Sequence, residues 1–311
     1  MTVFRSGFAA LVGRPNVGKS TLLNRLVGEK VAIVSPKPQT TRNRIVGVVT
    51  RPEGQLALLD TPGVHVAQNP LGRYMVKVAL EAVDEVELVM LVVEAPETEN
   101  HVRIDDHTQT LLDRLGHSKK NTFLVINKVD AVPKQWLLPQ IELYRNRYPF
   151  AEIHPLSAKT GNGVEAFLQR AYLQLPEGEP LFDKEILTDQ MEKTLVGEYI
   201  REPLLRHCRQ EVPYASAVRV EEFDESERHN GERSKNNRKG LIRIHASILV
   251  ERDSQKAIVI GKQGQMLKKI GTDARMSIER FLGCRVFLAL HVRVEPSWSE
   301  RPDSLRQLGY L

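Results

Sequence analysis

The feature that most constrains this chain is a short stretch near its N-terminus, Gly13-Arg14-Pro15-Asn16-Val17-Gly18-Lys19-Ser20. Its spacing of glycine, four residues, glycine, lysine and hydroxyl is that of the phosphate-binding P-loop. The glycines let successive N–H groups turn toward a phosphate, the lysine adds a positive charge, and the serine hydroxyl can ligate Mg²⁺. The apolar run at residues 8–12 predicts a buried strand before the loop, and residues 21–26 predict a helix whose dipole aims at the same anions. We therefore expect a phosphate site between a strand and a helix.

Strands and helices alternate over the first half of the chain. Predicted strands follow at residues 45–50, 55–59, 88–93, 122–126 and 152–154, and predicted helices at residues 71–83, 105–115, 136–147 and 164–175. This alternation indicates an α/β fold with a mainly parallel sheet that carries helices on both faces. Ligands of such sheets bind beyond the carboxyl ends of the strands, where the P-loop also falls.

A carboxylate follows the strand predicted at residues 55–59. Asp60-Thr61-Pro62-Gly63 places Asp60 where it can hold Mg²⁺ through water, and Gly63 where its N–H can reach a terminal phosphate. An ordinary Pro-Gly turn is the alternative, which the nearby P-loop disfavours. The proline-bearing loop at residues 35–42 offers Thr41 as a second hydroxyl ligand, with Thr40 as the competing choice.

The nucleotide base is specified by Asn127-Lys128-Val129-Asp130, after the strand predicted at residues 122–126. The Asp130 carboxylate can accept hydrogen bonds from guanine N1–H and the exocyclic amine together, a pair of donors that adenine lacks. Asn127 is expected to hold the loop, and the Lys128 stem to cover the base. Ser157-Ala158-Lys159 can close over the base with backbone N–H groups. The sequence thus predicts GTP or GDP with Mg²⁺ as ligands and opposes an ATP-dependent enzyme.

The predicted nucleotide site draws on several short segments. Its contact residues are Gly13, Arg14, Pro15, Asn16, Val17, Gly18, Lys19, Ser20, Thr21, Asp60, Thr61, Pro62, Gly63, Asn127, Lys128, Val129, Asp130, Ser157, Ala158 and Lys159. Its metal ligands are Ser20, Thr41 and Asp60, and the residues expected to act in hydrolysis are Lys19, Thr41 and Gly63.

A second domain is expected after the proline- and glycine-bearing stretch at residues 176–180. We predict a GTP-binding domain at residues 1–176, a linker at 177–187 and a second domain at 188–311. Within the second domain, predicted helices lie at residues 189–210, 256–260 and 266–282, and predicted strands at 215–222, 241–250 and 286–294. The polar, charged segment at residues 225–240 is expected to be a flexible hairpin loop.

A Gly-x-x-Gly turn joins two helices of this second domain. Such a turn can clamp nucleotide backbones through its N–H groups, as in KH domains, although it also occurs as a plain helix–helix turn. The order helix, strand, strand, helix, turn, helix, strand is the type II KH arrangement. Residues 252–285 carry eight basic and three acidic side chains, which favours an RNA footprint over an ordinary solvated helix face. The predicted RNA-binding residues are Ile260, Gly261, Lys262, Gln263, Gly264, Lys268 and Lys269.

Together these features resemble the bacterial Era GTPases, which join a translation-type GTP-binding domain to a type II KH domain. Gln39-Thr40-Thr41-Arg42 and Val259-Ile260-Gly261-Lys262-Gln263-Gly264 match that family's loops, and the resemblance covers nearly the whole chain, including the tail at residues 298–311. It implies a GTP-hydrolysing switch that binds small-subunit ribosomal RNA near its 3′ end and acts in small ribosomal subunit assembly. The rival interpretation is a switch whose KH-like domain binds a protein partner or a membrane surface.

One position departs from many regulatory GTPases. They carry glutamine directly after the Asp-x-x-Gly element to orient the attacking water, whereas this chain has Val64. The chain resembles the branch with a hydrophobic residue there, in which other groups place the water and a P-loop asparagine helps to hold a monovalent cation. Asn16 matches that asparagine, which makes K⁺ a candidate ligand; a polar turn residue without an ion is the alternative.

Composition adds the expected cellular setting. A net charge of +5 and a pI near 9.1 permit an anionic partner without requiring one. Cys208 and Cys284 lack metal-ligand spacing and are expected to be reduced, buried thiols of a cytosolic protein. The N-terminus has no signal-peptide core, and no apolar run reaches membrane-spanning length. We expect a monomer in the cytoplasm, with peripheral association at the inner face of the cell membrane as a further option.

Overall fold

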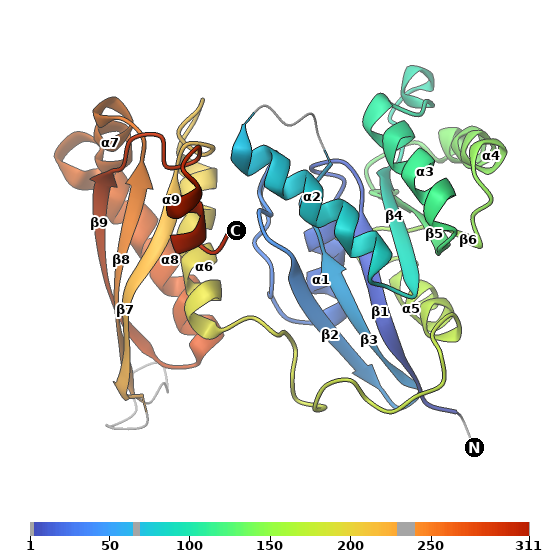
Figure 1. The fold of residues 1–311 in the computed structure, drawn as a ribbon, viewed down its shortest axis with the longest axis horizontal. Coiled ribbons are helices and arrows are strands. Elements are labelled where there is room, and N and C mark those ends of the chain that lie inside the picture. The colour runs from blue at the N-terminus through green and yellow to red at the C-terminus, as the bar shows by residue number, and fades with distance from the viewer. Residues whose placement is uncertain (1–2, 65–68, 229–239, 311) are drawn as a thin grey trace. The chain divides into compact units, whose positions relative to one another are not determined.

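The computed structural model describes residues 3–64, 69–228 and 240–310 (Figure 1). The chain divides into two compact units between Asp189 and Gln190. The boundary predicted at residue 176 lies 13 residues before this division and the boundary predicted at residue 187 lies two residues before it; both stay predictions.

The first unit is built on a six-stranded sheet in the order β2-β3-β1-β4-β5-β6. Its strands are β1 (Arg5–Val12), β2 (Ile45–Arg51), β3 (Gly54–Asp60), β4 (Leu88–Glu94), β5 (Asn121–Asn127) and β6 (Glu152–Pro155). Neighbouring strands pair in parallel except β2 with β3. Because β1 lies between β3 and β4, the strand order reverses at β1, and a ligand crevice forms at the carboxyl end of such a strand. The mainly parallel α/β fold is confirmed.

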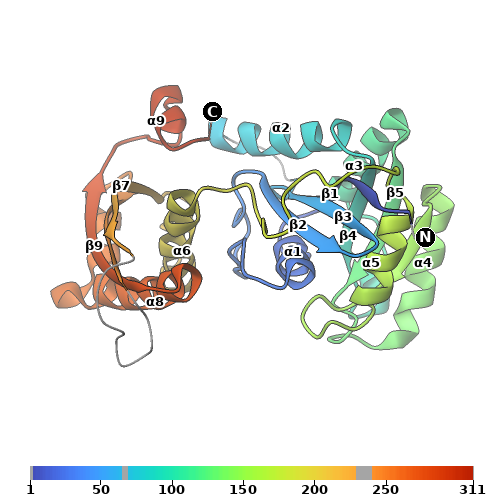
Figure 2. The ribbon, with the colours of Figure 1, turned by 90° about the horizontal axis from the view of Figure 1, so that it is seen from below.

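Helices cover both faces of this sheet (Figure 2). They are α1 (Lys19–Val27), α2 (Pro70–Asp84), α3 (Asp106–Ser118), α4 (Leu137–Arg147) and α5 (Val164–Leu173). On one face, α1 and α5 share a core with Leu11 and Phe123. On the other face, α2, α3 and α4 share a core with Val12 and Leu124. Since successive strand residues are buried on opposite faces, these strands are continuous apolar runs in the sequence.

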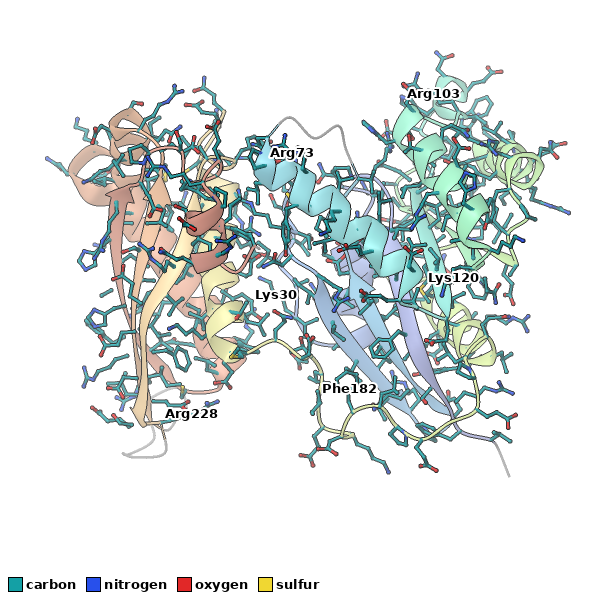
Figure 3. The ribbon with its side chains drawn as sticks, viewed as in Figure 1. Lys30, Arg73, Arg103, Lys120, Phe182 and Arg228 are labelled. Atoms are coloured by element: carbon teal, nitrogen blue, oxygen red, sulfur yellow. The ribbon has the colours of Figure 1, made fainter. Side chains whose placement is uncertain are left out.

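The segment after α5 is hydrogen-bonded along the first unit up to residue 188. The fully buried Gln55 accepts hydrogen bonds from the N–H groups of Leu181 (2.7 Å) and Phe182 (2.8 Å) through Oε1, and donates to the Phe182 carbonyl (2.8 Å). The Val48 N–H donates to the Leu187 carbonyl at 2.8 Å. The Phe182 ring, labelled in Figure 3, packs edge-on against Phe8 with 6.3 Å between ring centroids. A segment with the composition of a linker is therefore hydrogen-bonded to the sheet of the first unit.

The second unit is a three-stranded sheet in the order β7-β8-β9, with β8 and β9 parallel. Its elements are α6 (Glu192–His207), β7 (Ala217–Glu227), β8 (Leu241–Val250), α7 (Asp253–Ile260), α8 (Gln265–Leu282), β9 (Arg285–Val294) and α9 (Pro302–Gln307). Figure 2 shows α6 and α8 on one face of this sheet. Ile242, Ile244 and Ile248 alternate along β8 and are fully buried. The predicted order of a type II KH domain is confirmed.

The largest difference from a predicted boundary in this unit is at the end of β7. The strand expected at residues 215–222 continues to Glu227, so residues 225–227 are not part of a loop. Acidic residues are poor strand formers, but here Arg243 lies on the paired strand and forms an ion pair with Glu227 at 3.0 Å, which offsets that preference. Residues 229–239 of the predicted hairpin loop lie outside the described residues.

Two further features concern the thiols and the C-terminal segment. Cys208 and Cys284 are buried thiols, as predicted. The C-terminal segment contains the short helix α9, and Trp298 before it is fully buried with its indole N–H donating to the Ala215 carbonyl at 2.9 Å. Within the described ranges, no helix is long and apolar enough to cross a membrane.

Candidate nucleotide site and RNA interface

The P-loop joins β1 to α1 and encloses the side chain of Lys19. The Lys19 ammonium group donates to the carbonyls of Gly13 (3.0 Å) and Arg14 (2.9 Å), and the side chain is almost fully buried. Burial lowers the pKa of Lys19 to about 8, although the nearby Asp60 carboxylate acts in the opposite direction. The loop thus places a desolvated amine at the carboxyl end of β1, where an anionic ligand strongly favours its protonated form.

Three predicted site glycines lie where a side chain would collide with neighbouring atoms. A Cβ on Gly13 would lie 2.3 Å from the Val92 carbonyl oxygen, and one on Gly18 would lie 2.2 Å from the amide nitrogen of Asn127. A Cβ on Gly63 would lie 2.5 Å from the backbone nitrogen of Pro15. Gly13 and Gly18 also have positive φ angles of 151° and 99°, which strain any other residue. These glycines allow the P-loop to approach β4, β5 and the Asp60–Gly63 segment closely.

Three oxygen-bearing side chains meet beside Lys19. The Ser20 hydroxyl donates to Asp60 Oδ2 at 2.6 Å and lies 3.0 Å from the Thr41 hydroxyl, which is 3.3 Å from the same carboxylate oxygen. Asp60 is fully buried, and in the described part of the chain its other oxygen, Oδ1, has no hydrogen-bond partner. Burial raises the pKa of Asp60, opposed by Lys19 and the two hydroxyls. This set of oxygen donors with an orphaned carboxylate oxygen fits Mg²⁺.

The structure separates the two candidate threonines. The Thr40 hydroxyl donates to the Lys37 carbonyl at 2.7 Å, within its own loop. The Thr41 hydroxyl instead lies beside Ser20 and Asp60. Only the second arrangement brings a hydroxyl to the predicted metal site.

Val64 occupies the position that departs from many regulatory GTPases, and Asn16 is the P-loop residue predicted to help hold a cation. The Val64 side chain is buried in the apolar core, and its N–H donates to the Gly13 carbonyl at 3.2 Å, so neither its side chain nor its N–H can orient water. The Asn16 side-chain amide donates to the Pro36 carbonyl at 2.7 Å and ties the P-loop to the loop at residues 35–42. Binding of K⁺ by Asn16 stays a prediction.

Asn127 connects the phosphate and base segments. Its side chain is 2% exposed, donates to the Val17 carbonyl at 2.8 Å and accepts from the Ala158 N–H at 2.9 Å. The Lys128 ammonium forms an ion pair with Glu94 at 2.6 Å. The Asp130 carboxylate is exposed and has no partner among the described residues, which leaves both oxygens available to a ligand.

A cavity of about 500 Å³ is lined by part of the predicted site, but not by Asp60 or Asn127. Predicted site residues that line it are Pro15, Asn16, Gly18, Lys19, Ser20, Thr21, Thr41, Gly63 and Lys128. Asp130 and residues 157–159 do not line it, and the Thr61 hydroxyl donates to the Leu11 carbonyl (2.8 Å) as an anchor on β1. The sequence analysis missed Glu94. Its position as an acidic residue at the end of the otherwise apolar strand β4 could have indicated a role at the site.

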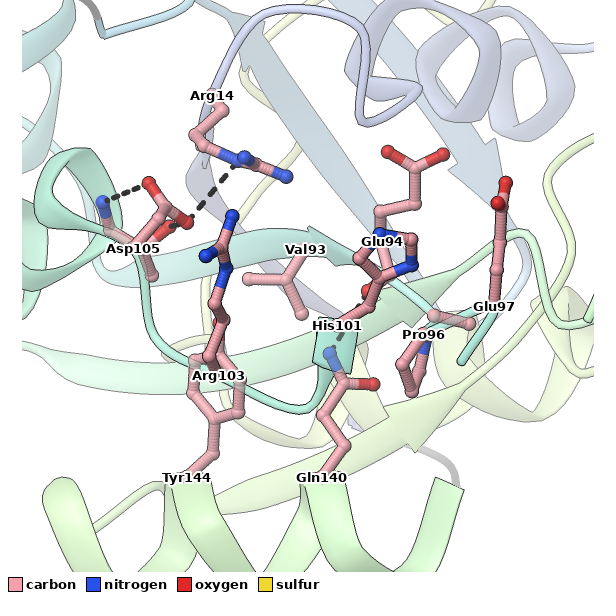
Figure 4. A pocket seen from close by; sticks show the side chains of 12 residues that line it. Arg14, Val93, Glu94, Pro96, Glu97, His101, Arg103, Asp105, Gln140 and Tyr144 are labelled. Atoms are coloured by element: carbon pink, nitrogen blue, oxygen red, sulfur yellow. Dashed lines mark hydrogen bonds and ion pairs between the residues drawn. The ribbon is translucent and has the colours of Figure 1, made fainter. Parts of the chain in front are cut away.

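Arg14 lies against a separate cavity of about 260 Å³ (Figure 4). Its guanidinium is 3.3 Å from the Asp105 carboxylate, which also accepts from the Thr108 N–H and hydroxyl and so caps α3. Burial acts to raise the pKa of Asp105, but the Thr108 hydrogen bonds and Arg14 hold it below its ordinary value. The Arg14 side chain therefore connects the P-loop to α3 rather than lining the cavity next to Lys19.

The Gly-x-x-Gly turn lies between α7 and α8 in the second unit. Gly261 and Gly264 have φ angles of 71° and 74°, and a Cβ on Gly261 would lie 2.6 Å from that of Met266. A groove of about 580 Å³ runs from the turn between α8 and β9, lined by Gly264, Lys268, Arg275 and Phe287 among others. Of the predicted RNA-binding residues, Gly264 and Lys268 line it, whereas Ile260, Gly261, Lys262, Gln263 and Lys269 do not. Arg275 and the half-exposed Phe287 were missed by the sequence analysis, although Lys268 and Arg275 are spaced to share a helix face.

The first unit is thus a P-loop GTPase domain, and the second is a type II KH domain. A family model described as "50S ribosome-binding GTPase" matches residues 8–128, and one described as "KH domain" matches residues 211–299. GTPase Era from Geobacter metallireducens is 50% identical over 307 residues, covering 99% of this chain and 98% of that relative.

Two solved structures are similar over their full length. Era in complex with MgGDPNP and nucleotides 1506–1542 of 16S ribosomal RNA is 36% identical, with a TM-score of 0.89 and 99% of each chain covered. Era from Aquifex aeolicus bound to GDP and AlF4⁻ is 37% identical, with a TM-score of 0.85, and 98% of this chain and 99% of that chain are covered. The chain belongs to the Era family of GTPases, and the enzyme class predicted from the sequence is confirmed.

Proposed function

We propose that this GTPase is a nucleotide-dependent switch that binds small-subunit ribosomal RNA near its 3′ end during assembly of the small ribosomal subunit. The observation that carries this proposal is the full-length similarity to a relative whose structure holds nucleotides 1506–1542 of 16S ribosomal RNA. The "50S" description belongs to a model that matches residues 8–128 alone, whereas the RNA-bound relative also matches the KH domain. The groove beside the Gly-x-x-Gly turn, with Lys268, Arg275 and Phe287, offers cations to phosphates and a ring to a base.

In the nucleotide site we assign roles by the geometry described above. The P-loop N–H groups and Lys19 hold the phosphates, and Ser20, Thr41 and Asp60 hold Mg²⁺, which neutralises phosphate charge when bound. Asp130 recognises guanine through its unpaired carboxylate. Lys19, Thr41 and Gly63 are the residues that we assign to hydrolysis. GTP would order the loop that carries Thr41, and this change is the switch.

Replacing Asp130 tests the base assignment. In Asp130→Asn, an amide donor faces the position of the guanine amine, while xanthine carries an oxygen there. We expect the variant to prefer xanthosine triphosphate over GTP in a competition against a fluorescent nucleotide. A variant that still prefers GTP would place the base elsewhere.

Replacing Lys262 and Gln263 together with Asp tests the RNA assignment. Two carboxylates at this turn repel the phosphates of a labelled single-stranded RNA copied from the 3′ end of small-subunit ribosomal RNA, while GTP binding stays unchanged. Arg209→Asp with Gln210→Asp is the matched control, because this exposed pair of the same unit has the same change in charge and Gln210 has a φ of 53° against 52° for Gln263.

The RNA assignment would be refuted if the RNA affinity of the Lys262/Gln263 variant lay within about threefold of that of the control. Such a difference is well below the ~1.4 kcal/mol of a tenfold loss. The rival interpretation, in which the KH domain binds a protein or a membrane surface, would then be preferred. We also propose that the protein is a cytoplasmic monomer. The further option of peripheral association with the inner face of the cell membrane is tested by flotation with anionic vesicles.

A further inference from the structure

The loop that follows β6 is a closed turn with few degrees of freedom. The Ser157 N–H donates to the Asn162 carbonyl (2.9 Å), and the Gly161 N–H donates back to the Ser157 carbonyl (2.8 Å). The Ser157 hydroxyl accepts from the Thr160 N–H at 3.1 Å. Ser157 and Ala158 are buried. The turn is therefore fixed from within before any ligand arrives.

These hydrogen bonds leave one donor of the predicted Ser157-Ala158-Lys159 element for a base. The Ser157 N–H is used inside the turn, and the Ala158 N–H donates to Asn127. The Lys159 N–H has no acceptor within the ranges that the structure describes. If this loop closes over guanine, the Lys159 N–H is the group that can donate to the guanine O6 atom.

An arginine on α1 holds the opposite side of the same peptide unit. Arg25 Nε donates to the Ala158 carbonyl at 3.0 Å, and its guanidinium also donates to the Lys159 carbonyl. The Ala158 carbonyl and the Lys159 N–H belong to one peptide plane and, because the bond is trans, point in opposite directions. A donor that fixes the carbonyl therefore fixes the direction of the N–H.

We propose that Arg25 is a positioning residue for guanine recognition, acting through the Lys159 N–H. This inference rests on the proposed nucleotide site. Because α1 begins at Lys19, one rigid helix carries both the phosphate-binding lysine and the group that orients the base loop. Arg25 touches no part of the nucleotide in this account, so its contribution appears in the choice of base.

The test is a comparison of three triphosphates on the full-length protein. Arg25→Ala should weaken GTP binding about three- to tenfold, as expected for lost hydrogen bonds that are partly open to water. 2-Aminopurine riboside triphosphate lacks both O6 and the N1–H. Because the variant keeps Asp130, which reads the N1–H, only the O6 contribution is lost, and the preference for GTP over this analogue should shrink. Inosine triphosphate keeps O6 and lacks only the amine that Asp130 reads, so the preference for GTP over it should not change. Arg25→Lys keeps one donor and should be intermediate.

Arg170→Ala is the matched control, because it removes an exposed arginine from the same unit, where Arg170 is bonded to Glu152. It should leave all three affinities unchanged, and thermal unfolding reports any general destabilisation of the variants. Equal losses for GTP and the 2-aminopurine analogue in Arg25→Ala would mean a merely structural role and would overturn the proposal. A wild-type protein that binds the three triphosphates equally would overturn the proposed nucleotide site itself, and this inference with it.

Discussion

Asn127 offers the most direct test of how the nucleotide site is assembled. In Asn127→Ala, the Val17 carbonyl and the Ala158 N–H both lose their side-chain partner. Both residues are 1% exposed, so water cannot easily replace the lost groups. Each buried group left unpaired costs about 1–3 kcal/mol, so the free energy of unfolding of the first unit should fall by about 2–6 kcal/mol.

The same substitution should weaken nucleotide binding, because the phosphate loop and the base loop no longer share a fixed connection. We expect the dissociation constant of a fluorescent GDP analogue to rise at least about tenfold, which corresponds to a loss of ~1.4 kcal/mol of binding free energy. Urea unfolding followed by tryptophan fluorescence and circular dichroism gives the stability, with separate transitions fitted for the two units.

Asn121→Ala is the matched control on the same strand. Its side-chain amide donates at 2.6 Å to the side chain of Gln174, and both groups are only partly buried. Water can solvate Gln174 in the variant, so we expect a loss below about 0.5 kcal/mol. A loss for Asn127→Ala no larger than for Asn121→Ala, with GDP affinity intact, would show that Asn127 does not couple the two loops.

Three other outcomes follow from the structure. Val64→Ala should change the hydrolysis rate by less than about threefold, because an aliphatic side chain cannot orient water. Exchanging Na⁺ for K⁺ should accelerate hydrolysis if Asn16 helps to hold a cation. Steady-state phosphate release measures both rates. Burial lowers the pKa of His154 below its ordinary 6.5. The contribution of His154 to stability is therefore fully present above pH 6.5 and is lost as the pH falls from 6.5 through the lowered pKa of the folded state. Urea titrations at several pH values should show a smaller loss of stability in acid for His154→Phe. Trp298→Ala should destabilise the second unit by about 3–5 kcal/mol, measured by urea unfolding, because it empties a fully buried site and orphans the Ala215 carbonyl.

The sequence was most informative where chemistry and backbone geometry demand a particular residue. The P-loop glycines and Asn127 could be recognised because few residues meet the steric and hydrogen-bonding needs of those positions. The direction of Arg14 toward α3 was not predictable, because an arginine in a motif says nothing about which neighbour attracts its side chain. The strand at residues 223–227 was missed because its acidic composition opposes a strand until the paired arginine is known.

The bond between Arg25 and the base loop was equally out of reach. Arg25 is an exposed residue on an amphipathic helix, and the carbonyl that it binds lies 133 residues later. Such a contact depends on the final packing of α1 against the loop after β6, and a single sequence carries no local sign of it.

The hydrogen bonds of residues 177–188 decide where an isolated GTPase domain can end. A fragment that stops at residue 176 would remove the Leu187 carbonyl from the buried Val48 N–H, and would leave Gln55 Oε1 without the two N–H groups that it accepts. Edge strand β2 would then present an open backbone donor, which invites pairing with a second molecule. A fragment that runs to Asp189 keeps these groups satisfied. The residues that resemble a linker are therefore part of the folded GTPase domain.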